Sequence, residues 1–83
     1  MQYHALMART DRLLEAMRAN PKADWSPRDV RTAARANGLT FRQRGTSHAV
    51  FTNAIGQHLT IPMHKPIKPV YIRRLVALIE AQG

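Results

Sequence analysis

The first regular pattern in the chain is a stripe of apolar side chains at helical spacing over residues 3–19. This spacing predicts an amphipathic helix, and Asn20-Pro21 ends it because the residue before a proline avoids helical geometry. We interpret the stripe as core packing; a contact with another subunit or with a protein partner is the alternative. Residues 1–25 are thus predicted to form an N-terminal helical arm. The members of the stripe are Tyr3, Leu6, Met7, Leu13, Leu14 and Met17.

A second helix is predicted to begin directly after Ser26. Serine suits the N-cap, Pro27 suits the first helical position, and Asp29 lies at the third, where an acid complements the helix dipole. Trp25 and Val30 have the spacing of a hydrophobic staple. Asn37-Gly38 should end the helix, because glycine readily takes a positive φ. The inward-facing positions are Val30, Ala33 and Ala34.

Three short strands follow, in which apolar and polar side chains alternate over residues 39–44, 48–53 and 57–62. A three-residue hairpin over 54–56, with Gly56 in the left-handed position, would pair Asn53 with Gln57. A similar link over 45–47 would connect the first two strands.

These turns fix which side chains share a face of the sheet. The predicted buried face has Phe51 opposite both Phe41 and Leu59, and Ala49 opposite Ile61. A slip of one residue would bury His48 beside Leu59, and we reject it because it separates the apolar side chains. The predicted solvent face carries Arg42, Arg44, His48, Val50, His58 and Thr60.

Apolar side chains at helical spacing after Pro69 predict another amphipathic helix at the end of the chain. Pro69 lies at its start and Gly83 at its end, with Arg73 and Arg74 facing outward. Two helices flanking three antiparallel strands give an α+β domain of order α-β-β-β-α over residues 26–83, with the helices covering one face of the sheet. The apolar positions of this helix are Ile72, Leu75, Val76 and Ile79.

Charge is the strongest signal in the composition. The 83 residues include 13 Lys and Arg against 5 Asp and Glu, for a net charge of +8. Most of this excess lies after residue 25, which favours a nucleic acid or an acidic protein as the partner of the compact domain. The chain has no cysteine, so disulfides are excluded and a reducing cytoplasm is expected. It has no long apolar run, so neither a signal peptide nor a membrane span is predicted.

The candidate chemistry centres on Arg42, Arg44 and His48, which flank the first turn of the predicted sheet. RNA carries its own nucleophile, the 2′-hydroxyl, so a ribonuclease needs only positioning, positive charge and a proton donor or acceptor. Histidine suits the last task because its unperturbed pKa lies near neutrality. DNA lacks this hydroxyl, so the pattern favours RNA.

Other catalytic classes find little support in the sequence. The four histidines show no zinc-ligand spacing, so neither a metal nor another cofactor is predicted. Paired carboxylates, a serine triad and a glycine-rich nucleotide loop are lacking as well. His4 is interpreted as structural or solvent-exposed. Secondary candidates for the site are His58, His64 and a basic helical stripe formed by Arg28, Arg31 and Arg35.

Three motifs in order resemble the HicA toxin family. They are Gly45-Thr46-Ser47-His48-Ala49-Val50-Phe51, then Leu59-Thr60-Ile61-Pro62-Met63-His64-Lys65, then Lys68-Pro69, and the resemblance covers about residues 26–83. HicA proteins are mRNA interferases of type II toxin–antitoxin systems and have a fold like that of double-stranded-RNA-binding domains. The resemblance implies that His48 is the general acid/base of a metal-independent endoribonuclease. Arg42 and Arg44, which flank the same turn, are the predicted ligands of the RNA phosphate, with Ser47 and Lys65 as further candidates.

The resemblance also implies binding partners. Two other hypotheses for the function are kept as well. A HicB-like antitoxin would cover the basic face, and the toxin–antitoxin complex could be an oligomer. The alternative function is a module of the same fold that binds RNA or an acidic protein and cuts nothing. A third possibility is a dimer built by residues 3–19.

Overall fold

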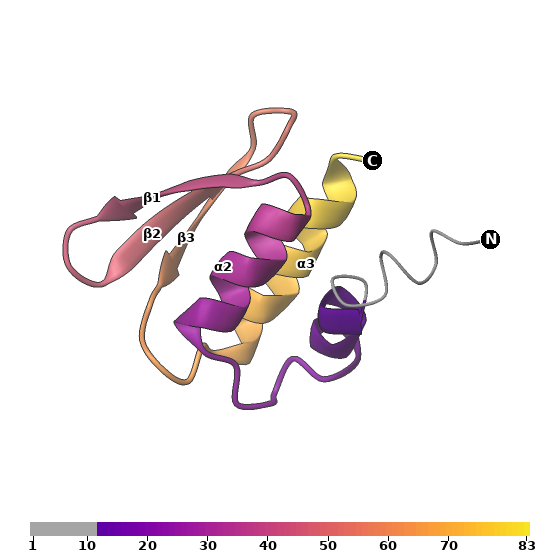
Figure 1. Cartoon of the computed structure of the whole chain (residues 1–83), viewed down its shortest axis with the longest axis vertical. Helices are drawn as coiled ribbons and strands as arrows, with labels where there is room; N and C mark the ends of the chain where they lie inside the picture. Colours follow the sequence, from indigo (N-terminus) through magenta and orange to yellow (C-terminus); the bar gives the residue numbers. More distant parts are fainter. Residues whose placement is uncertain (1–11) are drawn as a thin grey trace.

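The computed structural model describes residues 12–83, which form a layer of helices against one face of an antiparallel sheet (Figure 1). The predicted positions Tyr3, His4, Leu6 and Met7 lie outside the described residues. Residues 12–19 are helical. The elements that follow are α2 (Pro27–Ala36), β1 (Thr40–Arg44), β2 (His48–Thr52), β3 (His58–Pro62) and α3 (Pro69–Ala81). None of the helices within 12–83 has the length and apolar character needed to cross a membrane.

Helix α2 begins and ends as its sequence predicts. The Ser26 hydroxyl accepts a hydrogen bond from the Asp29 amide at 3.1 Å, and the Asp29 carboxylate accepts one from the Ser26 amide at 2.9 Å. This reciprocal capping box satisfies two amides that the helix leaves unpaired. At the other end Gly38 has a φ of +80°. The Leu39 amide still bonds to the Ala34 carbonyl, so β1 begins at residue 40 and not at 39.

The sheet has the order β1-β2-β3 and the predicted register. Phe51 lies opposite both Phe41 and Leu59, and Ala49 lies opposite Ile61. Gly45 and Gly56, with φ of +67° and +85°, make the two turns in the left-handed region that favours glycine. Strands β2 and β3 are each one residue shorter than predicted, at the ends that meet the hairpin. Alternation therefore places Phe51 on the core side and His48 on the opposite side of the same strand.

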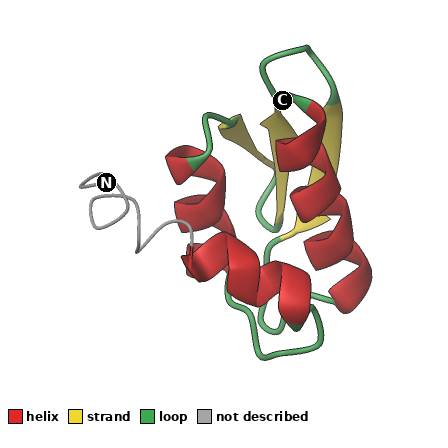
Figure 2. Ribbon diagram, turned by 90° about the vertical axis from the view of Figure 1, so that its right-hand side faces the viewer, coloured by secondary structure: helices red, strands yellow, loops and turns green. Residues whose placement is uncertain are grey.

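The two long helices cover the apolar face of the sheet, as Figure 2 shows from the helix side. The predicted inward positions of α2 and α3 are all buried, and Leu78, which the sequence pattern did not single out, is buried with them. The core consists of Val30, Ala33, Ala34, Leu39, Ala49, Phe51, Ile61, Ile67, Ile72, Leu75, Val76, Leu78 and Ile79, together with Met17.

The helical segment 12–19 packs on this same core. Met17 is fully buried, and Leu13 and Leu14 are partly buried against the core. The core-packing interpretation is thereby confirmed for the described part of the first helix. Arg18 adds a tie to α3, because its Nε donates to the Glu80 carboxylate at 2.8 Å. The carboxylate of Glu80 and, to a lesser extent, that of Glu15 raise the pKa of Arg18.

A buried asparagine locks the β2–β3 hairpin onto α3. Asn53 is only 5% exposed, and its Oδ1 accepts hydrogen bonds from the amides of Ile55 and Gln57 at 3.2 and 2.9 Å. Its Nδ2 donates to the Leu78 carbonyl of α3 at 3.0 Å. The hairpin closure between Asn53 and Gln57 is as predicted, whereas the contact with α3 depends on how the helix docks.

Replacing Asn53 with alanine is expected to lower the free energy of unfolding by about 1–3 kcal/mol, because buried polar groups of the hairpin and of Leu78 lose their partners. Urea denaturation of the two proteins measures this difference. The matched control is Ile55→Ala, which removes a side chain that is 61% exposed in the same turn and should change stability by no more than about 0.5 kcal/mol. Equal stability of the two variants would show that the backbone alone holds the hairpin.

Candidate functional site

The sheet face that the helices leave uncovered carries most of the predicted site. We call it the open sheet face. All its side chains are exposed except Val50 and Thr52, which are half-buried. The predicted clustering of the arginines, His48 and His58 on one solvent face is therefore confirmed. The open sheet face consists of Arg42, Arg44, His48, Val50, Thr52, His58 and Thr60.

His48 has a basic neighbour on the adjacent strand. Arg44 is its direct cross-strand partner, and Arg42 is the partner of Val50. Side chains that lie directly opposite in an antiparallel pair have Cβ atoms about 4.5–5.5 Å apart, and diagonal neighbours are about 7–8 Å apart. A long, flexible arginine at either position can reach an anion held at the His48 imidazole. The strand register thus brings the three predicted residues together.

The turn before β2 fixes where His48 stands. Gly45 takes the positive φ that the turn requires, and the Ser47 hydroxyl lies 3.3 Å from Nδ1 of the His48 ring. The Ser47 carbonyl accepts a hydrogen bond from the Met63 amide at 2.6 Å, which ties the turn to the chain just after β3. The His48 side chain itself is exposed on the open sheet face.

The remainder of the open sheet face is a shallow hollow between the two outer strands. Arg42 and Arg44 border it on β1, and His58 and Thr60 border it on β3. Val50 and Thr52 of the central strand form the floor between them, and Gly56 of the hairpin closes one end. The two arginines at the border and the hydroxyls of Thr52 and Thr60 suit an extended chain that carries phosphates.

No acidic side chain of the described part of the chain neutralises this face. Glu15 and Glu80 bind Arg18, and Asp29 caps α2. Asp24 pairs with Lys65 across 3.3 Å. The described carboxylates thus all lie on the helix side or in its loops, and the positive charge of Arg42 and Arg44 remains uncompensated within residues 12–83.

Several predicted candidates lie away from His48. Arg28 and Arg35 are exposed and Arg31 is half-buried on α2, in the layer on the opposite side of the sheet. The guanidinium of Arg35 lies 5.3 Å from the centre of the Phe41 ring, in cation–π geometry. Lys65 faces Asp24 and not the open sheet face, so a phosphate would have to compete with this carboxylate.

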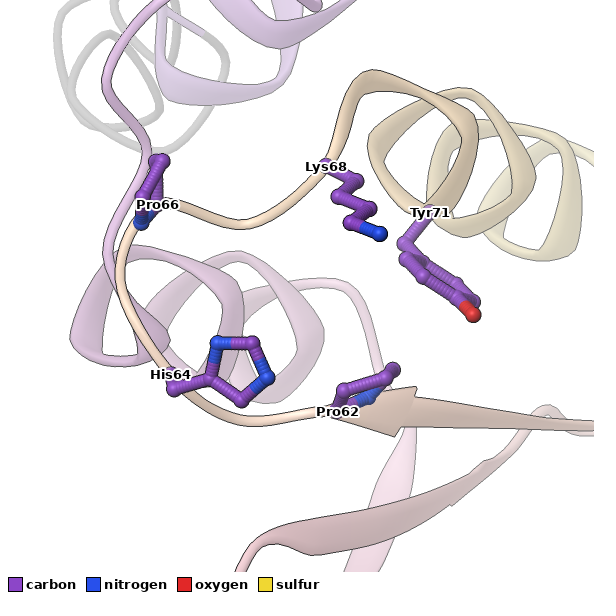
Figure 3. Close-up of a pocket in the computed structure, with 5 residues that line it drawn as sticks. All are labelled: Pro62, His64, Pro66, Lys68 and Tyr71. Atoms are coloured by element: carbon purple, nitrogen blue, oxygen red, sulfur yellow. The ribbon is translucent and has the colours of Figure 1, made fainter.

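His64 is part of a separate small pocket that sequence patterns did not reveal. Figure 3 shows its imidazole and Pro62 on one side, with Lys68 and Tyr71 from the start of α3 facing them. Pro66 completes the lining. The Lys68-Pro69 pair was visible in the sequence as a motif, but nothing in the local pattern indicated that Tyr71 would meet the end of β3.

Within residues 12–83, no group of three or more histidine and acidic side chains is arranged to hold a metal ion. Comparison with known proteins gives no match: no family model, no curated protein and no solved structure resembles this chain closely enough to identify its family. The class that the fold and site define is therefore a small α+β domain with a basic, histidine-bearing sheet face.

Proposed function

We propose that this protein is a metal-independent endoribonuclease, the toxin of a type II toxin–antitoxin pair of the HicA class. The observation that carries the proposal is the direct cross-strand pairing of His48 with Arg44 on an uncovered sheet face. The arrangement α-β-β-β-α with both helices on one face supports a fold of the double-stranded-RNA-binding-domain type. The motifs around His48, Pro62 and Lys68 support the same family.

The chemistry uses the nucleophile that RNA itself supplies. The 2′-oxygen attacks the adjacent phosphorus, the bond from phosphorus to the 5′-oxygen breaks, and the products are a 2′,3′-cyclic phosphate and a 5′-hydroxyl. His48 takes the proton from the attacking hydroxyl or gives one to the leaving oxygen, and water exchanges the other proton. Arg42 and Arg44 stabilise the negative charge that grows on the phosphate oxygens.

The same face explains how a partner would silence the enzyme. An acidic, HicB-like antitoxin lying on the open sheet face would neutralise Arg42 and Arg44 and cover His48, because charge complementarity guides such contacts. Within residues 12–83, both long helices pack on the other side of the sheet and leave this face to the partner. When no antitoxin is bound, the substrate of the enzyme would be mRNA.

The test is cleavage of single-stranded RNA by the purified chain in the presence of EDTA. Cleavage should continue with the chelator present, and a single 2′-deoxy substitution at the cut nucleotide should abolish it because the nucleophile is gone. The control is the same RNA with the 2′-deoxy substitution one nucleotide away, which should still be cut.

Intact RNA after long incubation would contradict the ribonuclease. If that RNA nevertheless binds with an affinity that falls steeply with salt, the protein is a binding module of the same fold, since the open sheet face is basic whether or not it cuts.

A further inference from the structure

The pocket between the end of β3 and the first turn of α3 is lined mainly by ring side chains, two of them aromatic. Pro62, His64, Pro66 and Tyr71 line it, and Lys68 supplies the cationic side chain (Figure 3). Tyr71 is half-buried and packs against the core, so its ring is held in place, whereas His64 and Lys68 are exposed. Rings on which a base can stack, next to one cation, are the features of single-stranded RNA sites.

The pocket adjoins the proposed catalytic histidine. Pro62, which lines it, is the direct cross-strand partner of His48. The next residue, Met63, donates its amide to the Ser47 carbonyl at 2.6 Å. One backbone hydrogen bond and the strand register thus join the pocket rim to the turn that carries His48. An RNA chain with its phosphate at His48 and Arg44 has its neighbouring nucleotide at this rim.

We propose that the pocket binds one nucleobase of single-stranded RNA, that of the nucleotide next to the phosphate held at His48. Tyr71 and the proline rings contact the face of the base, His64 hydrogen-bonds its edge, and Lys68 contacts the adjoining phosphate. The part that concerns cleavage rests on the proposed ribonuclease. The base-binding part does not, because it needs only that RNA lies across the open sheet face.

The small volume of the pocket favours some nucleobases over others. Its volume is about 70 Å³, roughly half of the 150 Å³ that an apolar cavity offers when it encloses a benzene ring. A pocket of this size takes the smaller single ring of a pyrimidine more readily than the fused double ring of a purine. We infer that it selects pyrimidines over purines, and that Tyr71, His64 and Lys68 set the sequence preference of the protein.

The experiment measures binding without cleavage, in the full chain carrying His48→Ala. Fluorescence anisotropy compares short oligouridylate with oligoadenylate of the same length at fixed salt. The His48→Ala protein should prefer oligouridylate. Adding Tyr71→Leu should weaken oligouridylate binding roughly tenfold and remove the preference, because base stacking on an aromatic ring is lost. Since Tyr71 also packs against the core, circular dichroism must show that this variant is folded.

Two further variants keep the test decisive if Tyr71→Leu does not fold. His64→Ala removes an exposed wall of the pocket and should reduce the preference for oligouridylate. Lys68→Ala should weaken both oligonucleotides equally and lower the slope of log affinity against log salt by about 0.7, the value for one phosphate contact with a single strand. Lys22→Ala removes the same charge from the exposed linker and should leave the slope of log affinity against log salt unchanged.

The outcomes separate this inference from the ribonuclease. An unchanged oligouridylate preference in folded Tyr71→Leu and His64→Ala overturns the pocket, even if wild type cuts RNA through His48. A preference that depends on these two residues supports the pocket, even if wild type leaves RNA intact. Equal binding of both oligonucleotides by the His48→Ala parent overturns the pyrimidine preference.

Discussion

Replacing His48 with alanine is expected to slow RNA cleavage by about 10²–10⁴-fold, the contribution typical of one general acid or base. The fold should be unaffected, because His48 is exposed on the open sheet face and does not contribute to the core. RNA affinity should change little, since Arg42 and Arg44 remain in place. Cleavage rates at saturating RNA, with thermal melting and anisotropy of the same preparations, measure the three quantities.

His48→Gln is the matched variant for this experiment. Glutamine keeps a polar side chain of similar length that can hydrogen-bond, but it cannot exchange a proton near neutral pH. A loss equal to that of His48→Ala assigns His48 to proton transfer. If glutamine restores cleavage, His48 only positions the RNA. Cleavage at the wild-type rate by both variants would remove His48 from the reaction altogether.

The second large effect is a loss of folding stability. It is expected for a substitution on the buried face of β2, the strand that carries His48 on its open face. Phe51→Ala is expected to lower the free energy of unfolding by about 3–5 kcal/mol, the usual range for truncating a buried phenylalanine. Phe51 is fully buried at the centre of β2, and its ring lies 5.1 Å from that of Phe41. Small domains have a total stability of about 5–15 kcal/mol, so a large share of the variant should be unfolded or lie close to its unfolding transition.

Urea denaturation followed by circular dichroism measures this loss. Ile55→Ala is the control, because Ile55 is 61% exposed at the β2–β3 hairpin and surface truncations usually change stability by no more than about 0.5 kcal/mol. A loss for Phe51→Ala as small as that of the control would mean that the sheet is not held by the core described above. A large loss would also remove RNA binding, because unfolding of the sheet separates Arg42 and Arg44 from the rest of the open sheet face.

The residues of the open sheet face could be predicted because their placement depends on short stretches of sequence. Turn length and glycine position set the register, and alternation then assigns each side chain of a strand to a face. These two rules suffice to place Phe51 and His48 on opposite faces of the sheet. The capping box at Ser26 and the end of α2 at Gly38 were predictable for the same reason.

The pocket at Tyr71 was not predictable in this way. Its lining comes from β3, the loop after it and α3, and these meet only because α3 packs against β3. The pairing of Lys65 with Asp24 joins residues far apart in the chain and likewise depends on docking. A site that draws on several elements has no signature in the period of any one of them.

The sequence by itself thus determined the elements, the strand register and the side of the sheet on which Arg42, Arg44 and His48 lie. Periodicity and turn chemistry act over a few residues, and they suffice for these features. Only the tertiary structure decided the contacts of Asn53 with α3, of Arg18 with Glu80, and of the pocket rim with the His48 turn. These contacts depend on how the helices pack against the sheet. That arrangement is controlled by the packing of the whole core.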